Sequence, residues 1–173
     1  MIKSYSIKQF LLQPVVEKDR EFYIQLHCDP FIMKNIARPL TLSQANKSFD
    51  ICLANNLSRL EARYTWIIID KHSGKNAGIC ALVLKDKKFN GTSFGILLAE
   101  EFHGQGNGRT ILAGIMEYGV REKGIEHYVG YSILGNEISY RLMISLNFDY
   151  KKEDSNSDRP AGYYWFKKMK HKD

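Results

Sequence analysis

Residues 100–112 read EEFHGQGNGRTIL, with glycines at the alternate positions 104, 106 and 108. Glycine costs backbone entropy in any ordered element, so this cluster indicates a tight turn whose backbone N–H groups face a ligand. The apolar residues that follow recur on one helical face: Ile111, Leu112, Ile115, Met116 and Val120. Orphan N–H groups and the dipole at a helix N-terminus favour an anion, and a pyrophosphate fits this arrangement. A plain glycine-rich turn between a strand and a helix is the alternative.

Spacing excludes two well-known phosphate motifs. A P-loop requires GxxxxGK followed by serine or threonine, and the sequence contains no such run. A dinucleotide fingerprint requires GxGxxG after the first strand of a βαβ unit. Here Arg109 occupies the third glycine position, and the segment comes late, after a predicted hairpin. The phosphate would therefore belong to another kind of ligand.

Strand and helix patterns alternate around this segment. Strands are predicted over residues 5–12, 64–70, 77–84, 92–99, 126–133 and 161–168, of which the second and third form a hairpin. Helices are predicted after Pro14, from Thr41, over 109–123 and over 136–146. Thr41 and Gln44 fit a capping box, and Ile138, Leu142 and Leu146 share one face of the last helix. A polar loop is predicted over 152–159. This order predicts one α+β (mixed α/β) domain spanning residues 1–173.

Composition narrows the classes of protein. The 173 residues are 44% hydrophobic and 25% charged, and no apolar run approaches 18 residues, so we expect no membrane partner. The three cysteines show no CxxC spacing, which favours reduced thiols and a cytoplasmic location. The five histidines are scattered, so we expect no metal site. The net charge of +6 is spread along the chain, which argues against nucleic acid as a partner.

Two motifs resemble those of a known family. HGQGNG at 103–108 resembles the coenzyme A signature Gln/Arg-x-x-Gly-x-Gly/Ala of the GNAT superfamily of N-acetyltransferases. The family's next helix often reads N-x-x-S/A-x-x-L-Y-x-x-x-G-F, and the matching residues here are Asn136, Ser139, Leu142, Met143, Asn147 and Phe148. The N-terminal half, with a helix carrying HCDPFIMKNI, is similar to the branch of the ribosomal-protein N-terminal (alanine/serine) acetyltransferases. The resemblance implies one GNAT domain: a central, mostly antiparallel sheet with a splayed parallel strand pair and flanking helices.

The resemblance also implies a co-substrate and its binding residues. Acetyl-CoA would bind without a metal, with its pantetheine and thioester beside the backbone of Leu97, Leu98 and Ala99. An N–H group there would hold the acetyl carbonyl and its developing negative charge. The residues expected to cradle the pyrophosphate are His103, Gly104, Gln105, Gly106, Asn107, Gly108 and Arg109. Asn136 is expected to bond the pantetheine arm, although asparagine is also a preferred helix N-cap.

The catalytic residues are less well defined. Met143 stands where many family members have a tyrosine that protonates the leaving thiolate, which methionine cannot do. Ser139 is the candidate substitute, and local bonding at the helix start is its alternative role. Glu100 and Glu101 are the acids nearest the motif and the candidate general bases. They could equally be solvated or interact with the helix dipole. His103 departs from the usual glutamine or arginine but keeps its backbone N–H.

These observations predict an acetyl-CoA-dependent N-acetyltransferase, an acyltransferase enzyme. The acceptor would be a primary amine, either a protein N-terminus or a small molecule. Phe31, Tyr64 and Trp66 are candidates to line an acceptor pocket, with core packing the alternative for Trp66. Met143 leaves a second function open, that of a catalytically weak acyl-CoA-binding sensor or interaction module. A homodimer is also left open.

Overall fold

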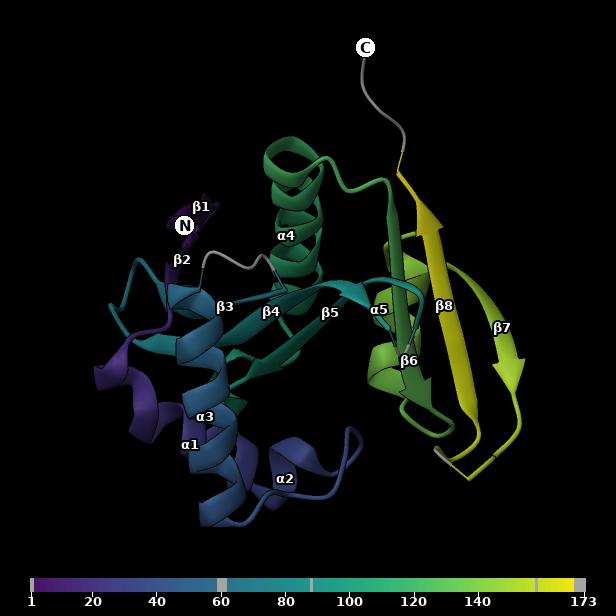
Figure 1. Ribbon diagram of the computed structural model, residues 1–173, viewed down its shortest axis with the longest axis horizontal. Coiled ribbons are helices and arrows are strands. Elements are labelled where there is room, and N and C mark those ends of the chain that lie inside the picture. Colours follow the sequence, from purple (N-terminus) through teal and green to yellow (C-terminus); the bar gives the residue numbers. More distant parts are fainter. Residues whose placement is uncertain (1, 59–61, 88, 158, 170–173) are drawn as a thin grey trace.

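The computed structural model describes residues 2–58, 62–87, 89–157 and 159–169, and its centre is one eight-stranded sheet (Figure 1). The strands are β1 (Tyr5–Ile7), β2 (Phe10–Pro14), β3 (Arg63–Asp70), β4 (Asn76–Asp86), β5 (Gly91–Leu98), β6 (His127–Ile133), β7 (Asp149–Glu153) and β8 (Gly162–Lys168). In space they follow the order β1-β2-β3-β4-β5-β6-β8-β7. Every neighbouring pair is antiparallel except the parallel pair β5 and β6. The predicted α+β fold class is confirmed.

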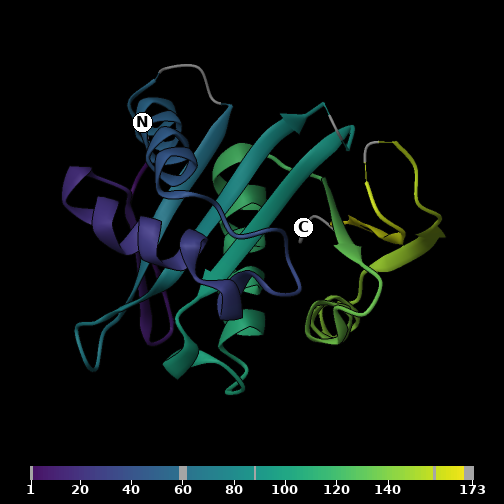
Figure 2. The ribbon, with the colours of Figure 1, turned by 90° about the horizontal axis from the view of Figure 1, so that it is seen from below.

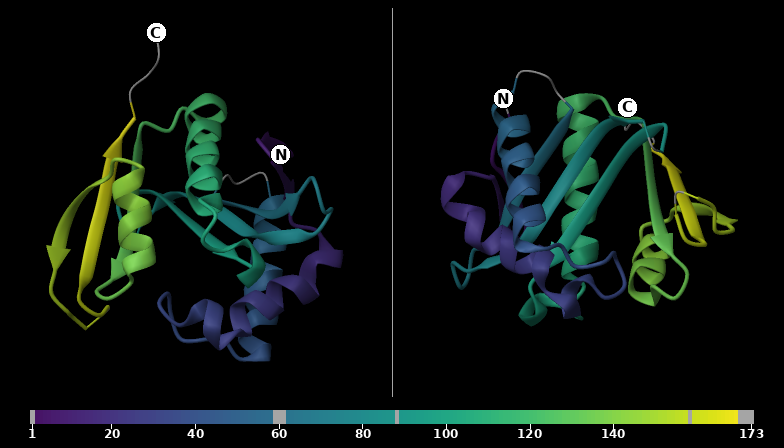
Figure 3. Two further views of the ribbon diagram at one scale, coloured as in Figure 1. Left: turned by 180° about the vertical axis from the view of Figure 1, so that it is seen from behind. Right: turned by 60° about the horizontal axis from the view of Figure 1, so that its bottom comes forward.

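Helices cover both faces of this sheet (Figures 1 and 3). They are α1 (Arg20–Cys28), α2 (Pro30–Met33), α3 (Leu42–Leu57), α4 (Asn107–Lys123) and α5 (Glu137–Ser145), with the 3-10 turns η1 (Glu17–Asp19) and η2 (Glu100–Phe102). Side chains alternate between the two faces of each central strand. Trp66 and Ile68 of β3 join the core beneath α4 and α5, whereas Ile67 joins the core beneath α1 and α3.

The first predicted strand, 5–12, is wrong as a single element. The chain turns back at Lys8 and Gln9, and Ile7 pairs with Phe10 across a two-residue hairpin loop. Lys8 takes the left-handed conformation there, with φ of 47°. Neither turn residue is glycine, proline, asparagine or aspartate, the residues that usually announce a turn. The sequence therefore reads as one continuous strand.

Helix boundaries follow the local chemistry. Gln44 N–H donates to Thr41 Oγ1 (3.3 Å) and Thr41 N–H donates to Gln44 Oε1 (2.9 Å), so the predicted capping box of α3 is confirmed. The predicted helix through HCDPFIMKNI is divided between α1 and α2, because Asp29 caps α2 and Pro30 is its first residue. Helix α4 begins at Asn107, two residues before the predicted start.

Two details of the C-terminal half differ from prediction. Residues 149–153 form the edge strand β7, overlapping the predicted polar loop, because a charged and exposed edge strand carries no apolar alternation. In α5 the predicted apolar face is wrong at Ile138, which is 73% exposed, whereas Met143 and Leu146 are buried. The first turn of α5 lies at an opening in the sheet, so no core is available to cover Ile138.

Candidate functional site

The sheet opens between its two parallel strands. β5 and β6 pair only at Thr92 with Tyr128 and at Ser93 with Val129. Beyond these positions the strands diverge, and the rest of β5 has no strand on that side (Figure 2). The C-terminal ends of two parallel strands therefore border a gap, which is the splayed pair that the resemblance implied.

The hydrogen-bond pattern of β5 shows which backbone groups face the gap. Ala99 N–H donates to Ala77 O of β4 at 2.9 Å, and Gly78 lies opposite Leu98. In an antiparallel pair, residues that exchange both hydrogen bonds alternate with residues that exchange none. Leu97 and Ala99 therefore direct their N–H and C=O groups toward β4. Ile96 and Leu98 direct theirs toward the gap. Of the three predicted backbone residues, only Leu98 has this orientation, and Ile96, which was not predicted, shares it.

The glycine segment lies at the end of β5 and opens α4. Gly104 and Gly106 are left-handed, with φ of 74° and 73°, and Gly106 is the N-cap of α4. Among the described residues, no atom lies within 4 Å of a Cβ built on either glycine. The first helical hydrogen bond runs from Thr110 N–H to Gly106 O. Within the described part of the chain, no acceptor is recorded for the backbone N–H groups of residues 104–109. These donors and the helix dipole suit an anion.

Side chains of this segment hold the loop in shape. Gln105 Nε2 donates to Glu101 O at 3.2 Å. Asn107 is only 5% exposed: its Nδ2 donates to Phe102 O (3.1 Å) and its Oδ1 accepts from Gln9 Nε2 (3.3 Å). Arg109 Nε donates to Ser145 O, the last residue of α5, at 3.3 Å. Asn107 can therefore offer a ligand its backbone N–H but not its side chain.

His103 joins the strand end to the N-terminal half of the chain. Its Nε2 lies 2.8 Å from Leu98 O, and a carbonyl only accepts, so Nε2 carries the proton. The imidazole also stacks on Phe31 of α2, with ring centroids 6.5 Å apart and planes at 17°. His103 thus occupies the carbonyl of Leu98 and leaves the N–H of the same residue facing the gap.

The other border of the gap is the N-terminus of α5. Asn136 is the N-cap: its Oδ1 accepts from Ser139 N–H at 3.0 Å, and its Nδ2 donates to Asn35 O at 2.7 Å. Ser139 is half-buried, and within the described ranges no partner is recorded for its hydroxyl. Met143 is 4% exposed, with its Cε 3.6 Å from the position of a Cβ on Gly130 of β6. The expected cap role of Asn136 is present, and among the described residues the Ser139 hydroxyl makes no local hydrogen bond.

The two candidate bases differ in their surroundings. Glu100 and Glu101 both lie in η2 and are exposed. Glu101 Oε2 is 3.2 Å from Lys75 Nζ, and Glu101 lines a small hollow with residues of the β3–β4 turn. That carboxylate therefore faces the turn, whereas Glu100 has no ion pair recorded among the described residues.

The predicted aromatic candidates are divided between core and surface. Tyr64 and Trp66 are 4% and 0% exposed, and their ring centroids lie 5.9 Å apart in the core. The expectation that Tyr64 lines an acceptor pocket is therefore wrong. Phe31 is 59% exposed beside His103. Tyr140 belongs to an aromatic cluster with Tyr150 and donates its hydroxyl proton to the Tyr150 hydroxyl at 3.4 Å. This hydrogen bond, and then burial, raises the pKa of the Tyr140 phenol.

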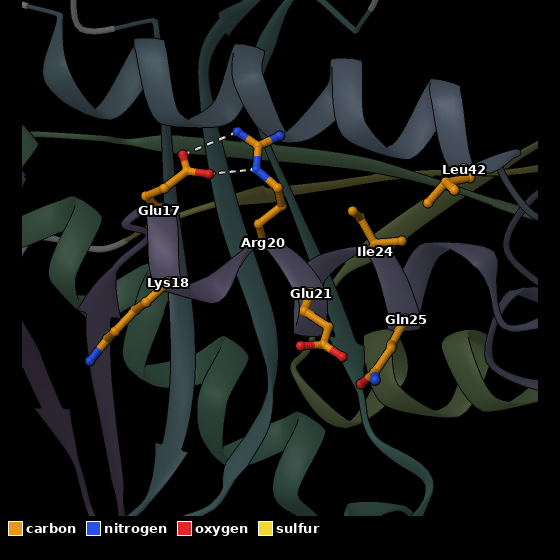
Figure 4. A pocket seen from close by; sticks show the side chains of 7 residues that line it. All are labelled: Glu17, Lys18, Arg20, Glu21, Ile24, Gln25 and Leu42. Atoms are coloured by element: carbon orange, nitrogen blue, oxygen red, sulfur yellow. Dashed lines mark hydrogen bonds and ion pairs between the residues drawn. The ribbon is translucent and has the colours of Figure 1, made fainter.

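A surface hollow elsewhere carries no part of this site. It lies between α1 and the start of α3 and is lined by Glu17, Lys18, Arg20, Glu21, Ile24, Gln25 and Leu42 (Figure 4). Arg20 Nε lies 2.6 Å from Glu17 Oε1, and Arg20 Nη2 lies 2.8 Å from Asp50 Oδ1. These two ion pairs raise the pKa of the Arg20 guanidinium. The hollow is on the α1–α3 side, away from the glycine segment and from α5.

All three cysteines are free, two of them buried. In the described ranges, no three His, Cys, Asp or Glu side chains gather where they could hold a metal ion. No helix in the described part of the chain is long and apolar enough to cross a membrane.

Comparison with known proteins decides the family. A family model described as the acetyltransferase (GNAT) domain matches residues 9–149. The chain belongs to the GNAT acetyltransferase family. This membership confirms the predicted acyltransferase class and acetyl-CoA as co-substrate. A sequence comparison with curated proteins finds no match.

Solved structures with the same fold include three informative neighbours. An acetyltransferase from Agrobacterium tumefaciens has a TM-score of 0.83 at 17% identity, covering 98% of this chain and 96% of the other. RimL, a ribosomal alpha-N-protein acetyltransferase in complex with coenzyme A, has a TM-score of 0.78 at 15% identity, covering 96% and 98%. Spermidine N-acetyltransferase from Vibrio cholerae, in complex with CoA and spermine, has a TM-score of 0.75 at 16% identity, covering 93% and 96%. The resemblance to the ribosomal-protein branch is confirmed in fold.

Proposed function

We propose that this GNAT protein transfers the acetyl group of acetyl-CoA to a primary amine, either a protein N-terminus or a small molecule. The observation that carries the proposal is the pairing of two features at one strand end. The backbone of Ile96 and Leu98 faces a gap in the sheet, and the N–H groups of residues 104–109 lie just beyond it.

The residues present fit coenzyme A. Left-handed Gly104 and Gly106 keep their surroundings clear of described atoms, so a pyrophosphate has room to approach the backbone. We assign the pyrophosphate to the N–H groups of residues 104–109 and the guanidinium of Arg109. We assign the pantetheine and thioester to the β5 edge at Leu97, Leu98 and Ala99. The N–H groups that face them belong to Leu98 and to Ile96, two residues before it. Asn136 would reach the pantetheine only by exchanging its present bond to Asn35.

The chemistry that acetyl-CoA supplies is an activated acetyl carbonyl, which an uncharged amine can attack. The Leu98 N–H would hold the carbonyl oxygen as negative charge develops on it. One such preorganised donor is typically worth about 3 kcal/mol of barrier. Because His103 already occupies the Leu98 carbonyl, the N–H is the main-chain group of Leu98 left to meet the acetyl oxygen.

Proton transfers need an acid and a base. We propose Ser139 as the proton donor to the departing thiolate, since it is half-buried in the first turn of α5 and no hydrogen bond is recorded for its hydroxyl among the described residues. We propose Glu100 as the base that removes the amine proton, acting through water because it is exposed. Glu101 is the weaker choice, because Lys75 engages its carboxylate.

The proposal also covers the length of the domain and the cellular compartment. The family model ends at residue 149, but β8 pairs with β6 over seven positions, so we propose that one domain spans 1–173. Free cysteines suit a reducing compartment, and we propose the cytoplasm as the place of action.

One observation favours a second function. Met143 is buried against β6 where the family's usual tyrosine would stand, so the gap has no phenol at this position. The alternative is a module that binds acyl-CoA as a sensor without rapid turnover.

An acceptor screen separates the two functions. The protein is mixed with acetyl-CoA and a panel of peptides and small amines, and free thiol is measured against an amine-free blank. Thiol release that depends on one class of amine supports the transferase. Calorimetric binding of coenzyme A without thiol release for any amine supports the sensor.

A further inference from the structure

Strand β1 runs along helix α4 toward the glycine segment. The rings of Tyr5 and Tyr118 pack edge to face, with centroids 5.2 Å apart. Further along β1, Ile7 packs against Gly114 so closely that a Cβ built on the glycine would lie 2.5 Å from Ile7 Cδ1. As the chain moves forward along β1, its contacts therefore move back along α4. The turn between β1 and β2 is thereby brought to the first turn of the helix.

One side chain of this turn bonds the first residue of α4. Gln9 Nε2 donates to Asn107 Oδ1 at 3.3 Å, and Asn107 Nδ2 donates to Phe102 O at 3.1 Å. A carbonyl oxygen only accepts, so the bond to Phe102 fixes the orientation of the Asn107 amide and leaves its oxygen toward Gln9. The turn is itself held, because Lys71 N–H donates to Gln9 O at 2.8 Å.

Burial makes this chain of hydrogen bonds costly to break. Asn107 is only 5% exposed, and Gln9 is half-buried. Within the described ranges, Gln9 is the one side chain recorded as a donor to Asn107 Oδ1. A buried amide oxygen that loses its donor does not regain water in exchange. By comparison, the ion pair between Lys75 and Glu101 is exposed, so solvent screens it.

The glycine segment needs such a contact because its own residues do not hold it in one shape. Gly104 and Gly106 are both left-handed, and glycine reaches many other backbone conformations at little cost. The link from Phe102 to Asn107 spans both glycines and closes the loop between η2 and α4. A loop fixed in this way presents its N–H groups without having to be ordered when a ligand binds, which favours affinity.

We infer that Gln9 is a positioning residue for the phosphate site. It acts through Asn107 and keeps the main-chain N–H groups of residues 104–109 in place for the pyrophosphate of coenzyme A. The inference rests on the proposed function and deepens it. The N-terminal hairpin thereby takes part in binding the co-substrate, although it lies 98 residues away in the chain from the residue that it holds.

The test replaces the amide of Gln9 with a side chain of similar length. Gln9→Met keeps an unbranched side chain but cannot donate to Asn107. Calorimetric titration of the ligand-free protein with CoA should give a Kd about 5- to 30-fold higher than wild type, the factor expected for one hydrogen bond to a buried partner. Urea unfolding of the same samples checks that the variant is folded at the temperature of the titration.

A matched control uses the other glutamine of the hairpin. Gln13 of β2 is also half-buried, and no side-chain hydrogen bond is recorded for it among the described residues. Gln13→Met should therefore keep the wild-type affinity for CoA.

A double-mutant cycle shows whether Gln9 acts through Asn107. Asn107→Ala removes the acceptor, so adding Gln9→Met to it should change the Kd for CoA by less than about twofold. Steady-state thiol release gives a further readout. Gln9→Met should raise the KM for acetyl-CoA and leave kcat and the KM for the amine unchanged, whereas a general loosening of the fold would change all three.

The outcomes separate the inference from the proposed function. Unchanged CoA affinity in Gln9→Met, an equal loss in Gln13→Met, or losses that multiply in the double variant would overturn the inference and leave the proposed function standing. A change in the KM for the amine as large as that for acetyl-CoA would also overturn it. Wild-type protein that does not bind CoA would overturn both.

Discussion

Replacing Gly106 with glutamate tests the phosphate site most directly. Gly106 is the N-cap of α4, and no described atom lies within 4 Å of a Cβ built on it. The glutamate therefore fits sterically and places a carboxylate beside the N–H groups proposed to hold the pyrophosphate. The backbone itself is strained, since a non-glycine residue at φ of 73° costs roughly 1–2 kcal/mol.

The expected loss of affinity follows from charge. One pair of like charges 4 Å apart costs about 1 kcal/mol in bulk water and about 4 kcal/mol near a protein surface. A pyrophosphate carries about two charges, so the loss is at least about 2 kcal/mol. Because about 1.4 kcal/mol is tenfold, CoA affinity should fall at least about 30-fold. The loss should shrink in 1 M salt, because screening shortens the reach of the charge.

Gly124→Glu is the control for strain. Gly124 caps the other end of α4 with φ of 61°, and a Cβ on it also meets no described atom within 4 Å. Calorimetry with CoA should give near wild-type affinity for this variant. Gly106→Ala separates strain from charge, since it keeps the strain without the carboxylate. Unchanged CoA affinity in Gly106→Glu, or an equal loss in Gly124→Glu, would refute the placement of the phosphate.

Three further predictions concern catalysis, packing and pH. Ser139→Ala should lower kcat about 100-fold with CoA affinity unchanged, and a wild-type kcat in steady-state thiol release would remove Ser139 from the mechanism. Gly114→Ala should lower the free energy of unfolding by about 1–3 kcal/mol in urea, because its Cβ would lie 2.5–2.7 Å from side-chain atoms of Ile7. In the double variant with Ile7→Ala this clash is relieved, so the combined loss should be smaller than the sum of the two single losses. A combined loss equal to that sum would contradict this packing. Burial, and then the charge of Arg63, lowers the pKa of His27, although its hydrogen bond to Tyr23 O opposes the shift. As pH falls below about 6.5, the unfolded chain therefore takes up a proton before the folded protein does, and the free energy of unfolding decreases until pH passes the lower pKa of the folded state. His27→Gln should make the free energy of unfolding depend less on pH in this range, as measured by denaturant unfolding at a series of pH values.

The sequence predicts most of the fold because its elements carry local signals. The capping box at Thr41 gives the start of α3, and the glycines before α4 indicate its start to within two residues. The hairpin at Lys8 and the edge strand β7 were missed for want of such signals. Lys8 adopts a left-handed turn that its residue type does not announce, and Asp149–Glu153 is polar on both faces.

The candidate site is less predictable because it depends on contacts between distant residues. Asn107 belongs to the glycine motif, yet its side chain turns inward to Gln9, 98 residues away in the chain. The bond between Asn136 and Asn35 spans 101 residues and could not be inferred from either motif. By contrast, the orientation of Ile96 toward the gap could be predicted from sequence, because Ile96 and Leu98 lie two residues apart on one strand.

The alternation along β5 has a consequence for how such a protein diverges. The groups of β5 that face the gap are main-chain N–H and C=O groups, and those of the glycine segment are main-chain N–H donors. A ligand held in this way makes few demands on the identity of side chains, provided that the strand keeps its direction and the turn keeps its glycines. The fold itself persists at 15–17% identity, with TM-scores of 0.75–0.83. Under the proposed function, side chains around the gap could then change with the acceptor without disturbing these main-chain groups.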